Sequence, residues 1–282
     1  MWALPYRYIL TRHNISRQVW WLCKGFYTFL FLKILFIWPI AGDISAYRAF
    51  AFTSFFSQFI YAPLFIAQIE ANVFFAVFAI LLILGILLRI NVFISILIFW
   101  FSISVTRYSL PIVNGSDLVL AQFLFLSIFF SYNGGNSRQR SSLHSVVTNA
   151  AFILARIQLL LIYIFSGYDK LISAEWRSGA AIYSISQLKF FNNPYFHVEL
   201  GEEISKVIGW SVILFELSFP LLVWFRPLRI TMLILGVAFH LAIAIVIGLI
   251  DFAPVMVICY ALFLPTPGSP TEDVNFYPSD DS

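Results

Sequence analysis

The amino-acid sequence predicts an all-α integral membrane protein that folds as a single bundle of about eight transmembrane helices. Two observations support this prediction: of its 282 residues 61% are hydrophobic and only 11% are charged, and its mean hydropathy is +0.88. Soluble domains typically contain about 25% charged residues. The composition therefore excludes a water-soluble protein and a nucleic-acid-binding protein, and it makes membrane lipid the first expected partner.

The apolar runs give the number of helices, because a bilayer core of about 30 Å needs about 20 apolar residues per helix, and fewer where a span is short. Eight runs qualify, at residues 19–40, 71–88, 90–105, 118–131, 149–168, 207–225, 228–248 and 252–264. Residues 42–70 are rich in aromatic side chains but are interrupted by charges and a proline, so we expect an interfacial or re-entrant stretch there. We expect a basic N-terminus at 1–17, the transmembrane bundle at 18–265 and an acidic, disordered tail at 266–282.

Positive charge is distributed unevenly among the loops. If the N-terminus is cytoplasmic, the loops on that side hold nine arginines and no acid before the tail, whereas the opposite loops hold six basic and nine acidic residues. Short cytoplasmic loops of membrane proteins are enriched in Lys and Arg. The pattern predicts a multi-pass protein of the plasma (inner) membrane, with both termini in the cytoplasm and residues 169–206 on the exoplasmic face.

Residues 163–188 are the first candidate for a functional site. The end of an apolar helix there runs into Asp169, Lys170, Glu175 and Arg177. Charges beside a membrane span are costly unless they face protein or water, so they mark functional sites. The alternative is an interfacial lysine with its amine among lipid headgroups. Partial desolvation against apolar walls would instead let Lys170 act as a base near neutral pH.

Two further ionisable residues lie within later spans. His240 is surrounded by apolar residues, and a buried histidine of this kind more often makes a hydrogen bond between helices than takes part in catalysis. Glu216 lies one helix earlier, and an unpaired carboxylate in hydrocarbon is costly. We therefore expect it to be neutral or paired; the available partners are His240, Lys24 and Lys33. Trp176 is explained equally well as a residue of the aromatic belt at the membrane surface.

The loop at residues 107–117 combines Arg107, Asn114 and Asp117. A turn followed by an Asp at a helix cap explains most of it. However, Asp117 begins a helix on the same predicted face as Lys170, which is compatible with one shared pocket. The sequence has no phosphate-binding glycine loop, no His/Cys cluster at metal-ligand spacing and no nucleophile elbow, so we expect no metal site.

Four blocks of the sequence carry a resemblance. They are RYSLPIVNGSDLVLAQFLFLSIFFSYN at 107–133, SGYDKLISAEWRSGAAI at 166–182, FELSFPLLVWFRPLRI at 215–230 and GVAFHLAIAIVIGLIDFAPVMVICYALFLP at 236–265. Their order and content resemble the HTTM (horizontally transferred transmembrane) domain family. This family is related to the membrane domain of the vitamin K-dependent gamma-carboxylase and to bacterial proteins that mature a sporulation-delaying toxin. The N-terminal third of the chain resembles the family only in hydropathy.

The resemblance implies roles for individual residues. Lys170 aligns with the lysine that serves the carboxylase as the base activating reduced vitamin K, and His240 aligns with a histidine near the quinone. In that enzyme the deprotonated hydroquinone reacts with dioxygen, a proton is removed from a peptide Glu, and carbon dioxide is added. A reduced, vitamin K-like quinone is therefore the implied cofactor. The surrounding pocket is expected to contain Arg107, Asn114, Asp117, Trp176, Arg177 and Glu216.

Three functional hypotheses follow. The first is a membrane lyase of the vitamin K-dependent carboxylase-like family, which uses Lys170 to activate a quinol and modifies a peptide Glu. The alternative is a maturation or export factor for a secreted antimicrobial or toxin peptide, without redox chemistry, whose partners are that peptide and a companion maturation protein. A small-solute transporter is the weakest of the three, because the spans contain few charges and no inverted halves are apparent.

Overall fold

The computed structural model describes residues 16–40, 55–64, 70–109, 113–130, 142–188 and 198–265. Within these ranges the regular structure is entirely helical, as the sequence predicts. Each of the eight predicted spans contains a helix. The predicted tail at 266–282, most of the basic N-terminal segment and most of the stretch at 42–70 lie outside the described residues.

The described helices follow one another along the chain in two halves. The first half holds α2 (Ser16–Ile37), η1 (Trp38–Ile40), α4 (Phe55–Ile60), α6 (Ala71–Leu87), α7 (Val92–Tyr108) and α8 (Gly115–Ser127). The second half holds α9 (Ser142–Ile172), α10 (Ala174–Ser178), α11 (Ala180–Gln187), α12 (Glu202–Leu222), α13 (Arg226–Ala242), the π-helical η4 (Ile243–Ile247), α14 (Phe252–Cys259) and η5 (Tyr260–Phe263).

Four of these helices are long and apolar enough to cross a membrane by themselves. They are Arg17–Ile40, Val146–Ile172, Glu202–Leu222 and Arg226–Ile247. The other apolar helices are shorter, at Ala71–Leu87, Val92–Arg107, Gly115–Ser127 and Phe252–Phe263. The protein is thus an all-α membrane-embedded protein with lipid-contacting helices, and the total of eight spans stays a prediction.

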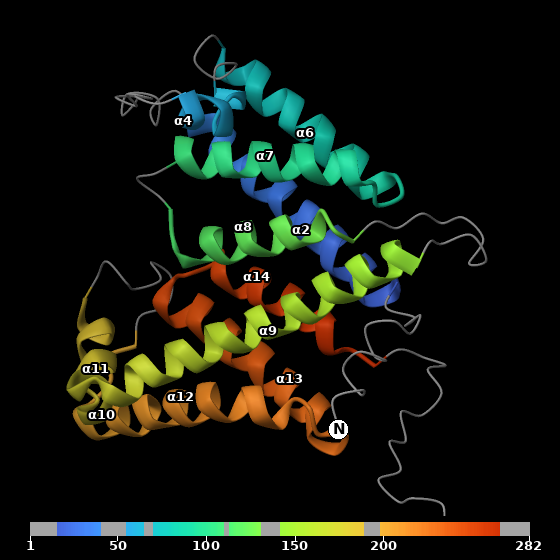
Figure 1. Ribbon diagram of the computed structural model, residues 1–282. Coiled ribbons are helices and arrows are strands. Elements are labelled where there is room, and N and C mark those ends of the chain that lie inside the picture. The colour runs from blue at the N-terminus through green and yellow to red at the C-terminus, as the bar shows by residue number, and fades with distance from the viewer. Residues whose placement is uncertain are drawn as a thin grey trace, which may run out of the picture.

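The helices are stacked side by side in one bundle (Figure 1). α6 and α7 lie at one side, α9, α12 and α13 lie at the other, and α2, α8 and α14 lie between them. Aromatic side chains fill the contacts: Phe101 stacks on Phe74 and Phe78 with ring centroids 5.4 and 5.6 Å apart. Such pairs add stabilisation beyond the apolar area that they bury.

α9 and α12 approach each other closely, and this contact positions the candidate site. A Cβ atom on Gly167 of α9 would lie 2.9 Å from Leu217 Cδ2 and 3.1 Å from Glu216 Cβ of α12. A Cβ atom on Gly209 of α12 would lie 2.8 Å from the Trp176 carbonyl oxygen of α10. Glycine is therefore needed at both positions for α12 to pack against α9 and α10 at this distance.

α9 is longer than the sequence predicts. The predicted span covers 149–168, whereas the helix runs from Ser142 to Ile172. Lys170 therefore lies in the last turn of the helix, rather than in the loop that follows it. The end of α9 that carries Lys170 lies beside α10 and α11, on the left of Figure 1.

Candidate functional site

The first cluster of the candidate site is an ion pair between α9 and α12. Lys170 Nζ lies 2.9 Å from Glu216 Oε2 and 3.1 Å from Glu216 Oε1. It also donates to Ser166 Oγ at 2.5 Å, and Ser166 Oγ donates to Glu216 Oε1 at 3.1 Å. The Glu216 side chain is 7% exposed and that of Lys170 is 18% exposed. A pair this well buried is stable only because each charge compensates the other and hydrogen bonds satisfy both.

Glu216 was expected to be neutral or paired, and it is paired, but with Lys170 and not with the partners considered, His240, Lys24 and Lys33. Lys24 instead donates to the Gly85 carbonyl oxygen at 2.6 Å and to the Leu88 carbonyl oxygen, so it caps the C-terminal end of α6. Lys33 pairs with two carboxylates described below. The sequence could not reveal the true partner, because the crossing of α9 and α12 decides which amine faces the carboxylate.

α10 covers the ion pair at the end of the bundle. Lys170 Nζ lies 5.0 Å from the centroid of the Trp176 ring, within cation–π range. Trp176 is thus part of the cluster in addition to any contact with the membrane surface. Arg177 is exposed, and its Nε donates to the Ser173 carbonyl oxygen at 3.4 Å. On the same short helix, the hydrogen bond from Ser173 lowers the pKa of the exposed Glu175 carboxyl.

The second cluster surrounds His240. Its Nε2 lies 2.7 Å from Tyr163 Oη, and Tyr163 Oη lies 2.5 Å from Tyr260 Oη. These residues come from α13, α9 and η5, so the cluster joins three elements. His240 is 1% exposed, and its Nδ1 has no hydrogen-bond partner among the described residues. The histidine therefore makes the interhelical hydrogen bond expected of it and keeps one nitrogen unused.

The two clusters lie along one face of α9. Tyr163, Ser166 and Lys170 are spaced at i, i+3 and i+7, which places them above one another on a helix. Lys170 reaches back to Ser166 with its amine, so the ion pair lies about one helical turn from Tyr163, roughly 4.5 Å along the axis. Phe219 packs within the second cluster, with its ring centroid 4.4 Å from that of Tyr163 and 5.4 Å from that of Tyr260. Lys170 and His240 thus have separate partners on neighbouring turns.

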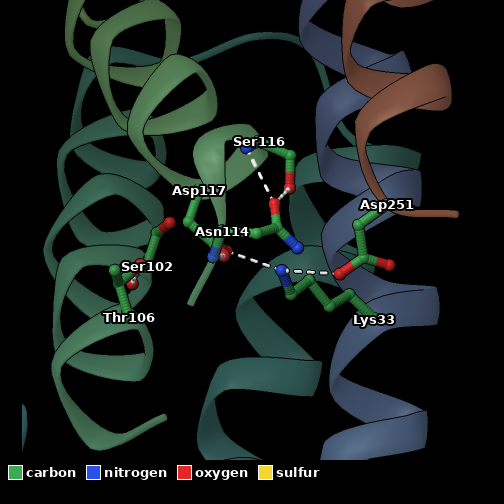
Figure 2. Close-up of polar contacts among 7 residues, drawn as sticks. All are labelled: Lys33, Ser102, Thr106, Asn114, Ser116, Asp117 and Asp251. Atoms are coloured by element: carbon green, nitrogen blue, oxygen red, sulfur yellow. Dashed lines mark hydrogen bonds and ion pairs between the residues drawn. The ribbon is translucent and has the colours of Figure 1, made fainter. Parts of the chain in front are cut away.

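A third cluster lies where α8 and α14 begin, as Figure 2 shows. Lys33 Nζ, from α2, lies 2.6 Å from Asp117 Oδ1 and 2.9 Å from Asp251 Oδ2. Asn114 is the N-cap of α8, and it forms a capping box with Asp117. A helix cap was predicted in this loop at Asp117, but the N-cap is Asn114, and Asp117 takes part in the capping box as the third residue of the helix. The described contacts of Asp117 are with Lys33 and Asn114, so the structure does not bring Asp117 into contact with Lys170.

Phe252, the first residue of α14, lies between the second and third clusters. A Cβ atom on Gly115 would lie 3.7 Å from the Phe252 ring, and that ring lies 5.5 Å from the His240 ring by centroids. Arg107, the remaining predicted pocket residue, lies in the last turn of α7, with Cζ 5.9 Å from the Tyr61 ring centroid.

Residues that sequence reasoning missed are Tyr163, Ser166 and Tyr260, together with the pairing of Lys33. The spacing of Tyr163, Ser166 and Lys170 on one helix face was a signal, but tyrosines in an apolar run are usually packing residues.

Among the described residues, no group of three or more His, Cys, Asp or Glu is arranged to hold a metal ion.

An apolar cavity of about 600 Å³ lies on another side of α13. It is lined by α2, α13, α14 and η5, and Tyr260 is the residue that it shares with the second cluster. Neither Lys170 nor His240 lines it. Its size is within the usual range of ligand pockets, and its lining suits a hydrocarbon chain.

Comparison with known proteins places the chain in a family. Searches of curated proteins and of solved structures found no match to this chain. The HTTM domain matches residues 42–267, a region that begins after α2 and includes all three clusters except Lys33. HTTM domains occur in vitamin K-dependent carboxylase-like and related membrane proteins. Because the match covers most of the chain, this protein belongs to the HTTM domain family.

Proposed function

We propose that this protein is a membrane enzyme that activates a reduced, vitamin K-like quinone by removing a hydroxyl proton, with Lys170 and Glu216 acting together as the base. The observation that supports this most directly is their buried ion pair on α9 and α12, which lies within the region matched by the HTTM domain. A buried charge pair next to a membrane span is retained at an energetic cost, which favours a functional role.

Both members of the pair are needed for proton transfer. Lys170 Nζ contacts four acceptor oxygens, two on Ser166 and two on Glu216, so every N–H bond of its ammonium group has a partner. Moving one of these protons to Glu216 produces a neutral amine beside a neutral carboxylic acid. The amine then accepts the substrate proton, and the resulting ammonium lies beside the oxyanion that it created. The local net charge rises from zero to +1 as the substrate falls to −1, so the charges remain compensated.

The residues present fit a quinol. Lys170 and Glu216 would hold the reacting hydroxyl, and the unused Nδ1 of His240 would contact a second oxygen of the quinol. The rings of Phe215 and Phe219, which pack against Tyr163, would contact the faces of the quinol ring. A reduced quinone would supply the reducing electrons for reaction with dioxygen.

The test is turnover of reduced vitamin K by the purified protein in nanodiscs. We expect oxygen-dependent consumption of the quinol with formation of the epoxide, and a loss of about 100-fold or more in Lys170→Ala and Glu216→Gln, in line with removal of a general base. Lys206→Ala is the control, because Lys206 is an exposed cation on the same helix as Glu216 and is not among the predicted pocket residues. No turnover of any quinol by the wild-type protein would exclude this function.

A second candidate is a non-redox maturation or export factor for a secreted peptide. The short helices α10 and α11 favour it, since they cover the Lys170 end of the bundle and expose Tyr183 and Leu188 for docking. The carboxylase-like function predicts that Lys170→Ala and His240→Ala abolish maturation of the peptide in cells. Full maturation by both variants, together with loss of maturation on deletion of the gene, would favour the second candidate.

A further inference from the structure

The two ring nitrogens of His240 have different environments. Nε2 lies 2.7 Å from Tyr163 Oη, whereas Nδ1 is buried and has no partner among the described residues. Leaving a buried donor or acceptor unpaired costs about 1–3 kcal/mol. Such groups are rare in folded proteins, and each requires an explanation. A ligand atom that accepts or donates a hydrogen bond at Nδ1 would remove this cost.

Counting protons assigns the tautomer, because hydroxyl hydrogens follow from the hydrogen-bond network. If Tyr163 donates to Nε2, Tyr260 donates to Tyr163 Oη at 2.5 Å, and both hydroxyl protons are used. If Nε2 instead carries the proton and donates to Tyr163, then Tyr163 donates to Tyr260. The Tyr260 proton is then left without an acceptor among the described contacts. The first arrangement satisfies more groups, and it places the imidazole proton on Nδ1.

The surroundings of the ring are aromatic and uncharged. Phe239 and Phe252 contact the imidazole edge-to-face, with centroids 4.9 and 5.5 Å away. A neutral N–H in such a pocket is a fixed donor that needs no reorganisation when negative charge develops on an acceptor oxygen. A neutral imidazole that polarises an oxygen in this way has precedent in enzymes.

We propose that His240 binds a ligand oxygen through Nδ1–H, and that Tyr163 and Tyr260 are positioning residues that hold Nε2 as the acceptor. The ligand class is an apolar ring compound with a carbonyl or deprotonated hydroxyl oxygen. This inference rests on the proposed function for its ligand, but the tautomer stands on the hydrogen bonds alone.

The tautomer is tested without any turnover. Protein labelled with ¹⁵N-histidine is measured by NMR in nanodiscs, and the His240 signals are assigned by their loss in His240→Asn. We expect a neutral ring with a protonated Nδ1 and an unprotonated Nε2. Tyr163→Phe should convert this signal to a mixture of tautomers, and Tyr260→Phe should do so more weakly. A ring protonated on Nε2, or a signal unchanged in Tyr163→Phe, would overturn the assignment.

Ligand contact is tested by adding phylloquinone to the same labelled protein. We expect the Nδ1–H signal to shift while Nε2 keeps its unprotonated character. A shift at Nε2 alone, or no shift at a concentration where phylloquinone is bound, would contradict the proposed contact.

Two amide substitutions separate the nitrogens in the turnover assay. The His240→Asn amide takes the position of Nδ1–H, whereas the His240→Gln amide takes that of Nε2. We expect His240→Asn to keep most of the activity and His240→Gln to lose about 100-fold, as for removal of one oxyanion donor. The opposite order would show that Nε2 is the functional nitrogen. If the wild-type protein turns over no quinol, the proposed function fails while the NMR result still decides the tautomer.

Discussion

Lys170 has the sequence position of an interfacial lysine but a different environment. Its amine is turned back along α9 to Ser166 and across to Glu216, beneath the Trp176 ring. Helical side chains point towards the N-terminal end of their helix. For a residue in the last turn, this direction leads into the bundle and away from the headgroups. The ion pair therefore follows from the helix continuing as far as Ile172.

Breaking this pair has a predictable effect on stability. Glu216→Gln keeps the shape of the side chain but leaves the Lys170 ammonium without its counter-charge, so we expect a loss of about 3 kcal/mol. The double variant Lys170→Met with Glu216→Gln should recover part of this loss, because no unpaired charge remains. Thermal unfolding in detergent measures the stability of the single variant and of the double variant. Equal losses in the single and double variants would show that the two side chains do not interact.

At the scale of helices, the close contact between α9 and α12 depends on glycine. Gly167→Ala would place a methyl group 2.9 Å from Leu217 Cδ2 and 3.1 Å from Glu216 Cβ, so the Leu217 side chain must move or the helices must separate. We expect a loss of about 1–3 kcal/mol from overpacking, with a weakened ion pair and reduced quinol turnover. Gly115→Ala is the control, since its methyl group would make an ordinary contact of 3.7 Å. Similar thermal unfolding of both variants would argue against the close α9–α12 contact.

α2 is held to α8 and α14 by Lys33. Lys33→Met would leave the buried Asp117 without its counter-charge, at a cost of about 3 kcal/mol. Asp251→Asn should cost about 1 kcal/mol or less, because Asp251 is 38% exposed and Lys33 retains Asp117. The unfolding temperatures of the two variants test this order, and that of Lys33→Met should be the lower. A larger effect of Asp251→Asn would mean that Asp251 is the main partner of Lys33.

The sequence was sufficient to locate the long apolar helices but not the short helices α10 and α11 or the side-chain partners. Apolar runs place the spans because the bilayer requires a minimum length of hydrocarbon-compatible helix. The capping box is local in sequence, so a cap in this loop was expected, although it was assigned to Asp117 instead of Asn114. The pairing of Lys170 with Glu216, and of His240 with Tyr163, depends on helix crossings that are set by distant glycines and aromatic residues. A single sequence does not specify those crossings.

For the whole molecule, the charge distribution predicts that both termini are cytoplasmic. Cys23 and Cys259 are fully buried, so they should not react with a membrane-impermeant maleimide. Ser178→Cys, on the exposed part of α10, should be labelled in intact cells. A cysteine replacing Ser282 should be labelled only after permeabilisation. The reverse labelling pattern would show that the topology is inverted. Labelling of both introduced cysteines from outside would show an error in the number of spans.

The most direct measurement of the central claim is the rate of reduced vitamin K consumption by Lys170→Ala with and without added ethylamine. If the amine at this position takes the substrate proton, the variant should be inactive alone and should regain part of the wild-type rate as ethylamine is added. The same addition should leave the rate of the control variant Lys206→Ala unchanged. Consumption by Lys170→Ala at the wild-type rate without any amine would contradict the account.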